Sequence, residues 1–102
     1  MDVTFGLSQT LLARLHGLFR RYPEVCRVEI FGSRAREEAS GASDIDLVVF
    51  APHISNQRFA QLWSDVVEGS DSVFKIDLLW WESLTNASLR QKIRQEARPF
   101  YP

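Results

Sequence analysis

The spacing of apolar residues changes along the chain between the period of a helix and the period of a strand. Leucine and phenylalanine recur every three or four residues over 8–22, which predicts a helix that Ser8 caps and Pro23 ends. Apolar and charged residues alternate over 25–31, which predicts a strand with one well-buried side. Cys26 falls inside this strand, so we expect its thiol to be buried and unreactive.

The pattern then predicts two further strands and two further helices. Residues 44–51 and 73–81 are mostly apolar, and the second run is continuous enough to suggest a strand covered on both faces. Helical spacing returns over 55–68 and 86–97. The tail, 99–102, can add a short strand or dock on a partner. This order favours a small α/β domain of the α+β kind, with helices packed against a twisted mixed sheet.

Length, charge and cysteine content limit the function further. The 102 residues make one domain, 1–102, with a core but without room for a second domain that binds a separate substrate. A formal net charge of −1 makes nucleic acid an unexpected direct ligand. A single cysteine excludes an internal disulfide, and two distant histidines lack the spacing of a zinc site. Neither a secretory signal nor a membrane-spanning run is visible, so we expect a cytoplasmic protein with no membrane partner.

Three aspartates are candidates for binding a metal ion. Asp44 and Asp46 are two residues apart in a strand, so their side chains project from one face, roughly 6.5 to 7 Å apart. Carboxylates so placed can hold one divalent cation or straddle two. Asp77 interrupts the last apolar run, where an unpaired buried charge is expensive, and we expect it beside the other two. The alternatives are that Asp44 caps a turn, that Asp46 is solvated, and that Asp77 pairs with Lys75 or an arginine or lies on an edge.

A turn of small and basic residues precedes the aspartates. Glycine at position 32 lets the backbone approach a phosphate, and the N–H groups at the start of a short helical turn over 34–39 attract negative charge. The Ser33 hydroxyl can add a hydrogen bond, and Arg34 and Arg36 offer charge-assisted contacts to phosphate oxygens. A capped turn with surface arginines explains these residues equally well when they are taken alone.

Joined together, these motifs resemble a known family. The segments GSRAR, SDIDL and the later IDLL are similar to those of the minimal nucleotidyltransferases of the DNA polymerase beta superfamily. The resemblance implies the nucleotidyltransferase fold, with Mg²⁺ on Asp44 and Asp46 and with Asp77 completing the metal site or acting as a base. The residues expected at the nucleotide phosphates are Gly32, Ser33, Arg34, Arg36 and Ser43.

The resemblance also implies an activity and a partner. It implies transfer of a nucleoside monophosphate, with AMP from ATP as the expected case, to a hydroxyl group with release of pyrophosphate and with two Mg²⁺ ions. Small members of the family are commonly the antitoxins of all-helical HEPN-domain ribonuclease toxins, and a tyrosine of the toxin can be the acceptor. One departure is that Glu37, followed by Glu38, stands where family members often have glycine, and two acids are unfavourable near phosphates unless they point outward.

Two other functions fit parts of the sequence. A binding module with weak or absent chemistry could neutralise its partner by contact, anchored by aromatic residues, although we expect Trp63 and Trp80 to lie in the core. The aromatic candidates for such anchors are Trp63, Trp80, Trp81, Phe100 and Tyr101. A metal-dependent nuclease or phosphatase would use the aspartates but gives the Gly-Ser turn no specific task. Self-association of the chain is left open.

Overall fold

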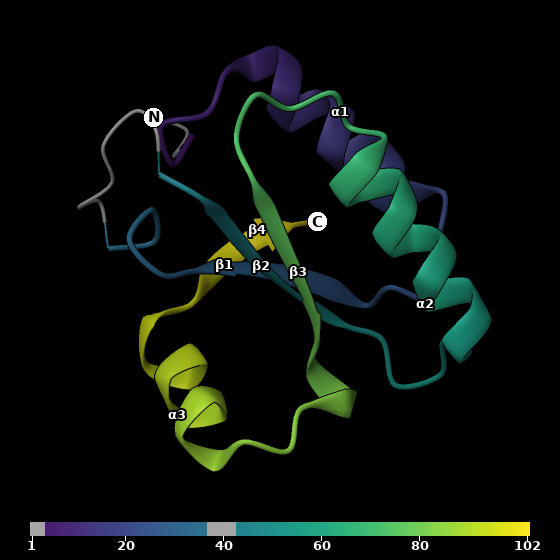
Figure 1. Ribbon diagram of the computed structural model, residues 1–102, viewed down its shortest axis with the longest axis vertical. Coiled ribbons are helices and arrows are strands. Elements are labelled where there is room, and N and C mark those ends of the chain that lie inside the picture. The colour runs from purple at the N-terminus through teal and green to yellow at the C-terminus, as the bar shows by residue number, and fades with distance from the viewer. Residues whose placement is uncertain (1–3, 37–42) are drawn as a thin grey trace.

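A mixed four-stranded sheet lies at the centre of the molecule (Figure 1). In this computed structural model, residues 4–36 and 43–102 are described. The strands follow the order β3-β2-β1-β4, in which β2 and β3 are parallel and β1 is antiparallel to both β2 and β4. The bounds of the strands are β1 Arg27–Phe31, β2 Ile45–Phe50, β3 Ile76–Trp80 and β4 Arg98–Tyr101. The expected mixed sheet is therefore confirmed, and the tail forms its fourth strand.

Helices cover both faces of the sheet. The first two helices pack on one face and α3 packs on the other, as the ribbon shows (Figure 1). The bounds of the helices are α1 Gln9–Arg20, α2 Asn56–Trp63 and α3 Ala87–Glu96. None of the helices in the described ranges combines the length and the hydropathy that a membrane span requires.

Side-chain caps fix where each helix begins. The side chains of Ser8, Ser55 and Asn86 each accept a hydrogen bond from the backbone N–H three residues later. The second helix does not run evenly to residue 68, because after Trp63 the chain continues as a short π-helical segment, Ser64–Glu68. The predicted helices are thus present, and their first residues are those that the capping residues indicate.

Successive side chains along β2 point to opposite sides of the sheet. Leu47 and Val49 contribute to the larger core beneath α1 and α2, while Val48 and Phe50 belong to a smaller cluster with Ile93 of α3. All four β2 side chains are at most 8% exposed. Because residues two apart share a face, the polar residues at the start of β2 are directed to the same side as α3.

Three expectations about burial are wrong. The third strand is not covered on both sides, since β3 lies at the edge of the sheet and leaves Asp77 and Leu79 partly exposed. Cys26 is exposed because the first strand begins only at Arg27, so its thiol is not part of the core. Trp63 is 39% exposed at the end of α2 instead of lying in the core.

The other aromatic candidates are used mainly inside the molecule. Trp80 stacks on Phe59 with 5.1 Å between ring centroids, and its indole N–H donates to the Ala51 carbonyl. Phe100 is only 5% exposed within the larger core, and Tyr101 packs tilted against Phe19. Among the aromatic candidates in the described part of the chain, Trp63 is therefore the most exposed, whereas Trp81 is half-buried.

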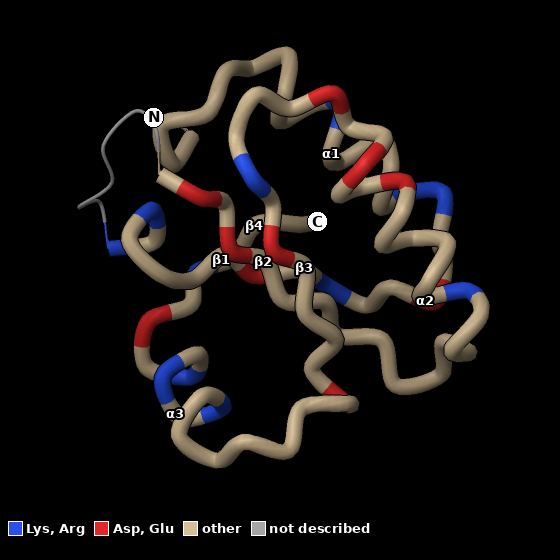
Figure 2. The backbone as a smooth tube through the Cα atoms, in the orientation of Figure 1, with Lys and Arg blue, Asp and Glu red and all other residues tan. Residues whose placement is uncertain are grey.

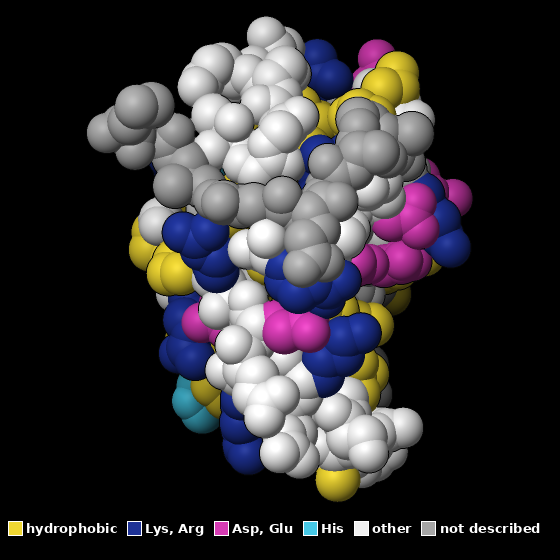
Figure 3. Space-filling view, turned by 90° about the vertical axis from the view of Figure 1, so that its left-hand side faces the viewer, with side chains coloured by type: hydrophobic (Ala, Val, Ile, Leu, Met, Phe, Trp, Pro, Cys, Tyr) yellow, Lys and Arg dark blue, Asp and Glu magenta, His cyan; other side chains and the backbone are white. Residues whose placement is uncertain are grey.

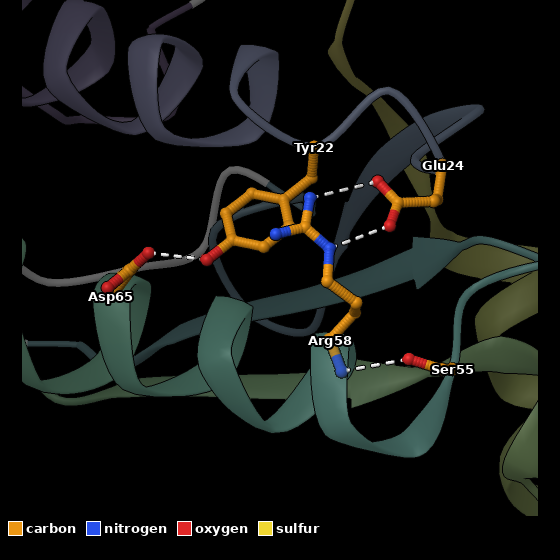
Figure 4. Close-up of polar contacts among 5 residues, drawn as sticks. All are labelled: Tyr22, Glu24, Ser55, Arg58 and Asp65. Atoms are coloured by element: carbon orange, nitrogen blue, oxygen red, sulfur yellow. Dashed lines mark hydrogen bonds and ion pairs between the residues drawn. The ribbon is translucent and has the colours of Figure 1, made fainter.

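A set of polar contacts among Tyr22, Glu24, Arg58 and Asp65, here called the Tyr22 brace, connects the chain after α1 to α2 and to the segment that follows α2 (Figure 4). The Tyr22 hydroxyl donates to Asp65 at 2.5 Å, and Arg58 donates two hydrogen bonds to Glu24 at 2.8 and 3.2 Å. The Arg58 guanidinium also lies over the Tyr22 ring, 4.4 Å from its centroid. Burial, together with the Asp65 carboxylate, raises the pKa of Tyr22 to about 12.

Candidate active site

The parallel pairing of β2 and β3 places two aspartates side by side. Asp46 is the register partner of Asp77, and Figure 2 shows the acidic positions of the two strands next to each other. Burial, followed by the nearby charge of Asp77, raises the pKa of Asp46. The structure thus brings together two acids that lie 31 residues apart in sequence.

The Gly-Ser turn lies against Asp46, one member of this pair. Gly32 has a φ of +78°, and a β-carbon at this position would collide with a carboxylate oxygen of Asp46. The backbone then makes one helical turn, in which the Arg36 N–H donates to the Gly32 carbonyl at 3.2 Å. The half-buried Ser33 begins that turn. Glycine is favoured here because the positive φ strains any other residue and an added β-carbon would force the Asp46 carboxylate to move.

Asp44 lies near this pair of aspartates in a more open position. It precedes β2 by one residue and is exposed, whereas the Ile45 side chain between the two aspartates is fully buried in the larger core. The charge of Asp44 also raises the pKa of Asp46, although less than burial and Asp77 do. Its carboxylate is therefore close enough to act on the pair while remaining accessible to solvent.

Arg34 has a structural position instead of an open one. It is 2% exposed, and it donates from Nε and Nη2 to the Ser43 carbonyl at 3.1 and 2.8 Å and from Nη1 to the Phe5 carbonyl at 2.9 Å. Its guanidinium also lies 4.7 Å from the centre of the Phe74 ring. These contacts join the turn to the start of β2 and to the N-terminal segment, so the expectation of an Arg34–phosphate contact conflicts with the geometry.

The remaining candidates surround the turn. Arg36 donates to Glu96 of α3 at 2.9 Å, in a pair whose side chains are partly exposed. Ser43 is half-buried and its carbonyl holds Arg34. Glu37 and Glu38, and with them the second half of the expected helical turn, lie outside the described residues.

A cleft opens beside the aspartate pair. It has a volume of about 450 Å³ and is lined by both carboxylates and by a mainly apolar wall. The apolar residues of this wall include Phe31, Trp63, Leu79 and Leu89. Such a cleft can admit a flat apolar group and bring it against Asp77, whose side chain is 43% exposed.

The exposure of Asp77 changes one argument from the sequence. The sequence analysis expects a costly buried charge at Asp77, and this expectation is wrong. Asp77 lies on an edge strand, with the Lys75 ammonium 3.7 Å from one of its oxygens. Both alternative explanations, the edge and the lysine, thus hold for this residue. What distinguishes Asp77 is its register with Asp46, which neither alternative requires.

The donor atoms suit a hard divalent cation. Carboxylate oxygens are preferred ligands of Mg²⁺, and a cation would offset both the burial of the Asp46 charge and its repulsion by Asp77, which together raise the pKa of Asp46. Within 4–36 and 43–102, however, no three carboxylate, imidazole or thiol groups are close enough to form a complete site unaided. Asp46 and Asp77 fit as the first two ligands, and further oxygens would come from Asp44, water or a substrate phosphate.

Comparison with known proteins identifies the family. Residues 14–102 match the family model described as polymerase beta, nucleotidyltransferase. The chain belongs to this family. The nucleotidyltransferase fold expected from the motifs is therefore confirmed. A separate comparison with curated proteins gives no match.

Solved toxin–antitoxin complexes contain chains similar to this nucleotidyltransferase domain. One is from a toxin–antitoxin complex with AMP-PNP, with a TM-score of 0.67 and 22% identity over 87% of this chain and 71% of that chain. Another is from the tri-AMPylated Shewanella oneidensis HEPN toxin in complex with its MNT antitoxin, with a TM-score of 0.65 and 21% identity over 92% and 71%. A third, from the MntA–HepT complex, has a TM-score of 0.63 and 21% identity over 91% and 71%. At these identities the similarity shows the shared fold.

Some features of the site could not be read from the sequence. The apolar wall includes residues from β1, α2, β3 and α3, and nothing in the periodicity of α2 marks Trp63 as part of it. The contact between Gly32 and Asp46 joins two motifs whose spacing alone leaves their distance open. The burial of Arg34 could be seen only in the structure, because a Gly-Ser-Arg motif reads the same whether its arginine is buried or lies at the surface.

Proposed function

We propose that this nucleotidyltransferase uses Mg²⁺ to move AMP from ATP onto a hydroxyl group of a HEPN-domain partner in the cytoplasm. The observation that carries the proposal is the contact of the Gly32 turn with Asp46, which itself pairs with Asp77. A phosphate-binding turn and metal-binding carboxylates are then parts of one site. A nuclease or phosphatase would need the carboxylates but would not need the glycine turn pressed against them.

Each polar residue receives a separate task. The backbone N–H groups after Gly32 and the hydroxyls of Ser33 and Ser43 would bind phosphate oxygens. Arg36 would exchange its partly exposed contact with Glu96 for a phosphate. Arg34 would act indirectly, by holding the turn in shape.

The acidic residues of the site would carry the metal and the proton. Asp44, Asp46 and Asp77 would hold Mg²⁺, which when bound supplies positive charge to offset the charge that develops on the transferred phosphoryl group. We assign proton transfer to Asp77, because its side chain is the more exposed member of the aspartate pair and faces the cleft.

The reaction itself is a substitution at phosphorus. The acceptor oxygen forms a bond to the α-phosphorus of ATP, and the bond from that phosphorus to the oxygen that bridges to the β-phosphate breaks. Pyrophosphate leaves with the electron pair of that bond, and the proton of the acceptor hydroxyl passes to Asp77. Holding the two reactants in line contributes most of the catalysis, since the protein forms no covalent intermediate.

Two observations support AMP and a tyrosine of a helical partner. The similar structures include a complex with AMP-PNP and a complex in which a HEPN toxin is tri-AMPylated. In this chain, the wall of the cleft is apolar and aromatic, which suits the ring of a tyrosine better than an aliphatic serine. The acceptor would therefore be a tyrosine that enters between Trp63 and Leu89.

Transfer of label tests the proposal. The chain is incubated with Mg²⁺, ATP labelled in its α-phosphate and the product of the neighbouring reading frame as the candidate HEPN-domain partner, and the label on that partner is measured. We expect labelling by the wild type and a loss of about 100-fold or more in Asp46→Asn and Asp77→Asn, because each removes a metal ligand. Asp71→Asn is the matched control, since Asp71 is exposed and has a φ of +59°, which asparagine tolerates.

The results also separate the enzyme from a binding module. Neutralisation of the partner by wild type and Asp46→Asn alike, with no label on either, would refute transfer and favour binding alone. Removal of Mg²⁺ by a chelator gives a second control, because it should abolish labelling without separating the two proteins.

A further inference from the structure

One face of α3 is directed toward the aspartates. The helix packs on the sheet through Ile93, and Leu89 from its first half lines the cleft that contains Asp46 and Asp77. Lys92 follows Leu89 by three residues, which places both side chains on neighbouring positions of one helix face. That face therefore extends from the carboxylates along α3.

The same face of α3 also reaches the Gly-Ser turn. Glu96 follows Lys92 by four residues and accepts a hydrogen bond from Arg36 at 2.9 Å. Arg36 in turn belongs to the helical turn that begins after Gly32. Lys92 thus lies on α3 between a residue that borders the carboxylates and a residue that binds the phosphate turn.

The Lys92 ammonium is near enough to Asp46 for the two charges to interact. The Lys92 side chain is exposed, and its ammonium has no hydrogen bond or ion pair with any residue that the structure describes. Figure 3 shows Lys and Arg side chains, interspersed with acidic ones, across the middle and lower part of this side of the molecule.

We propose that Lys92 binds the β- or γ-phosphate of the nucleotide and holds the pyrophosphate group against the Gly32 turn. The inference rests on the proposed function and adds a substrate-binding residue from outside the Gly-Ser and Asp-x-Asp motifs. The α-phosphate has to lie at the carboxylates, where the acceptor reaches it. The two further phosphates then extend toward the turn, along the side of α3 that carries Lys92.

Arg94 provides a matched control on the same helix. It follows Lys92 by two residues, so it projects about 200° away around the helix axis. Its guanidinium lies 5.4 Å from the Trp81 ring, and it lines a different cleft with Phe50 and Trp81. Replacing Arg94 or Lys92 with glutamine therefore removes the same charge from α3 but affects opposite sides of the helix.

Equilibrium binding tests the inference without relying on catalysis. The affinities of the full chain for AMP-PNP and for AMP are measured by calorimetry with Mg²⁺ present, in wild type, Lys92→Gln, Lys92→Arg and Arg94→Gln. We expect Lys92→Gln to weaken AMP-PNP binding roughly tenfold and to leave AMP binding unchanged, because AMP lacks the two outer phosphates. Lys92→Arg should retain most of the AMP-PNP affinity, and Arg94→Gln should bind both nucleotides as the wild type does.

Each other result contradicts the inference in a recognisable way. Wild-type affinity for AMP-PNP in Lys92→Gln would refute it, even if the protein binds ATP and transfers AMP. Equal losses for AMP and AMP-PNP would show a general effect on the site and would also refute it. If the wild type binds neither nucleotide, the proposed function fails together with this inference.

Discussion

At the scale of single residues, Gly32 and Asp46 depend on each other. The α-carbon of Gly32 lies so close to the Asp46 carboxylate that an added β-carbon would displace it. The sequence predicts a glycine for phosphate approach and an aspartate for a metal, but it does not predict that the two are in contact. That contact depends on how β1 and β2 pair, which brings Phe31 opposite Asp46. One residue of slippage would separate them.

Substitution of Gly32 tests this dependence. We expect Gly32→Ala to lower the free energy of unfolding by about 1–2 kcal/mol and AMP-PNP affinity by tenfold or more, because the positive φ is strained and Asp46 has to move. Thermal unfolding and calorimetry measure the two effects. Gly17→Ala is the control, since Gly17 lies within α1 with no heavy atom within 4 Å of the added carbon. It should stabilise the helix by up to about 1 kcal/mol and bind nucleotide normally.

The ionised Asp46 carboxylate is needed for the proposed metal site, but it lowers the stability of the folded protein. Because its pKa is raised in the folded protein, the native state holds a proton more tightly than the unfolded chain does. The wild type should therefore lose stability as pH rises from about 4 through the pKa of the folded protein. Asp46→Asn should show a flatter profile and a higher unfolding midpoint at pH 7, with AMP transfer at least about 100-fold slower. An unfolding midpoint at pH 7 below that of the wild type would contradict this account.

At the scale of elements, local sequence patterns predict where helices begin, whereas long-range pairing decides where a strand lies in the sheet. Helix starts are predictable, because Ser8, Ser55 and Asn86 cap regular apolar repeats. The edge position of β3 is not predictable, because the position of a strand in the sheet depends on partners far away in sequence. The same reason explains why Trp63 is exposed, since it lies near that edge and not beneath a neighbouring strand.

The Tyr22 brace gives a prediction for the packing of α1 on α2. Since its folded pKa is about 12 and its ordinary value is 10.0, Tyr22 contributes stability below about pH 10 that is lost as pH rises to 12. Tyr22→Phe should cost about 1 kcal/mol at pH 7 and should decline less steeply between pH 10 and 12. Denaturant unfolding at several pH values measures both, and Tyr101→Phe, as the control, should keep the steep decline of the wild type. Equal slopes for wild type and Tyr22→Phe would contradict the assignment.

At the scale of the whole molecule, the sheet separates the larger hydrophobic core from the candidate active site. The larger core with α1 and α2 fills one side, and the acids, the turn and α3 share the other (Figure 2). The sequence indicates this division through the spacing of Asp44, Asp46 and the later Asp77, which only a common sheet can bring together. The sequence could not indicate Lys92, because α3 carries several basic residues with the same surface pattern.

The position of Trp63 leads to a prediction about the partner. If the acceptor enters through the cleft, Trp63→Ala should raise the KM for the proposed HEPN-domain partner about tenfold, because a large exposed aromatic contact is lost. The affinity for AMP-PNP should be unchanged. Val73→Ser is the control, since Val73 is 91% exposed and lines a different surface cleft. Equal KM values for wild type and Trp63→Ala would show that the acceptor approaches elsewhere.

The central claim is that the Gly32 turn and the Asp46–Asp77 pair form one site for a metal-bound nucleotide. Paramagnetic broadening of backbone amide signals by Mn²⁺ in the presence of AMP-PNP tests it most directly, because the effect falls steeply with distance from the ion. The account predicts that the signals of Gly32, Asp46 and Asp77 disappear together, while that of Arg27, at the far end of β1, persists. Broadening centred elsewhere, or of Asp46 and Asp77 without Gly32, would contradict it.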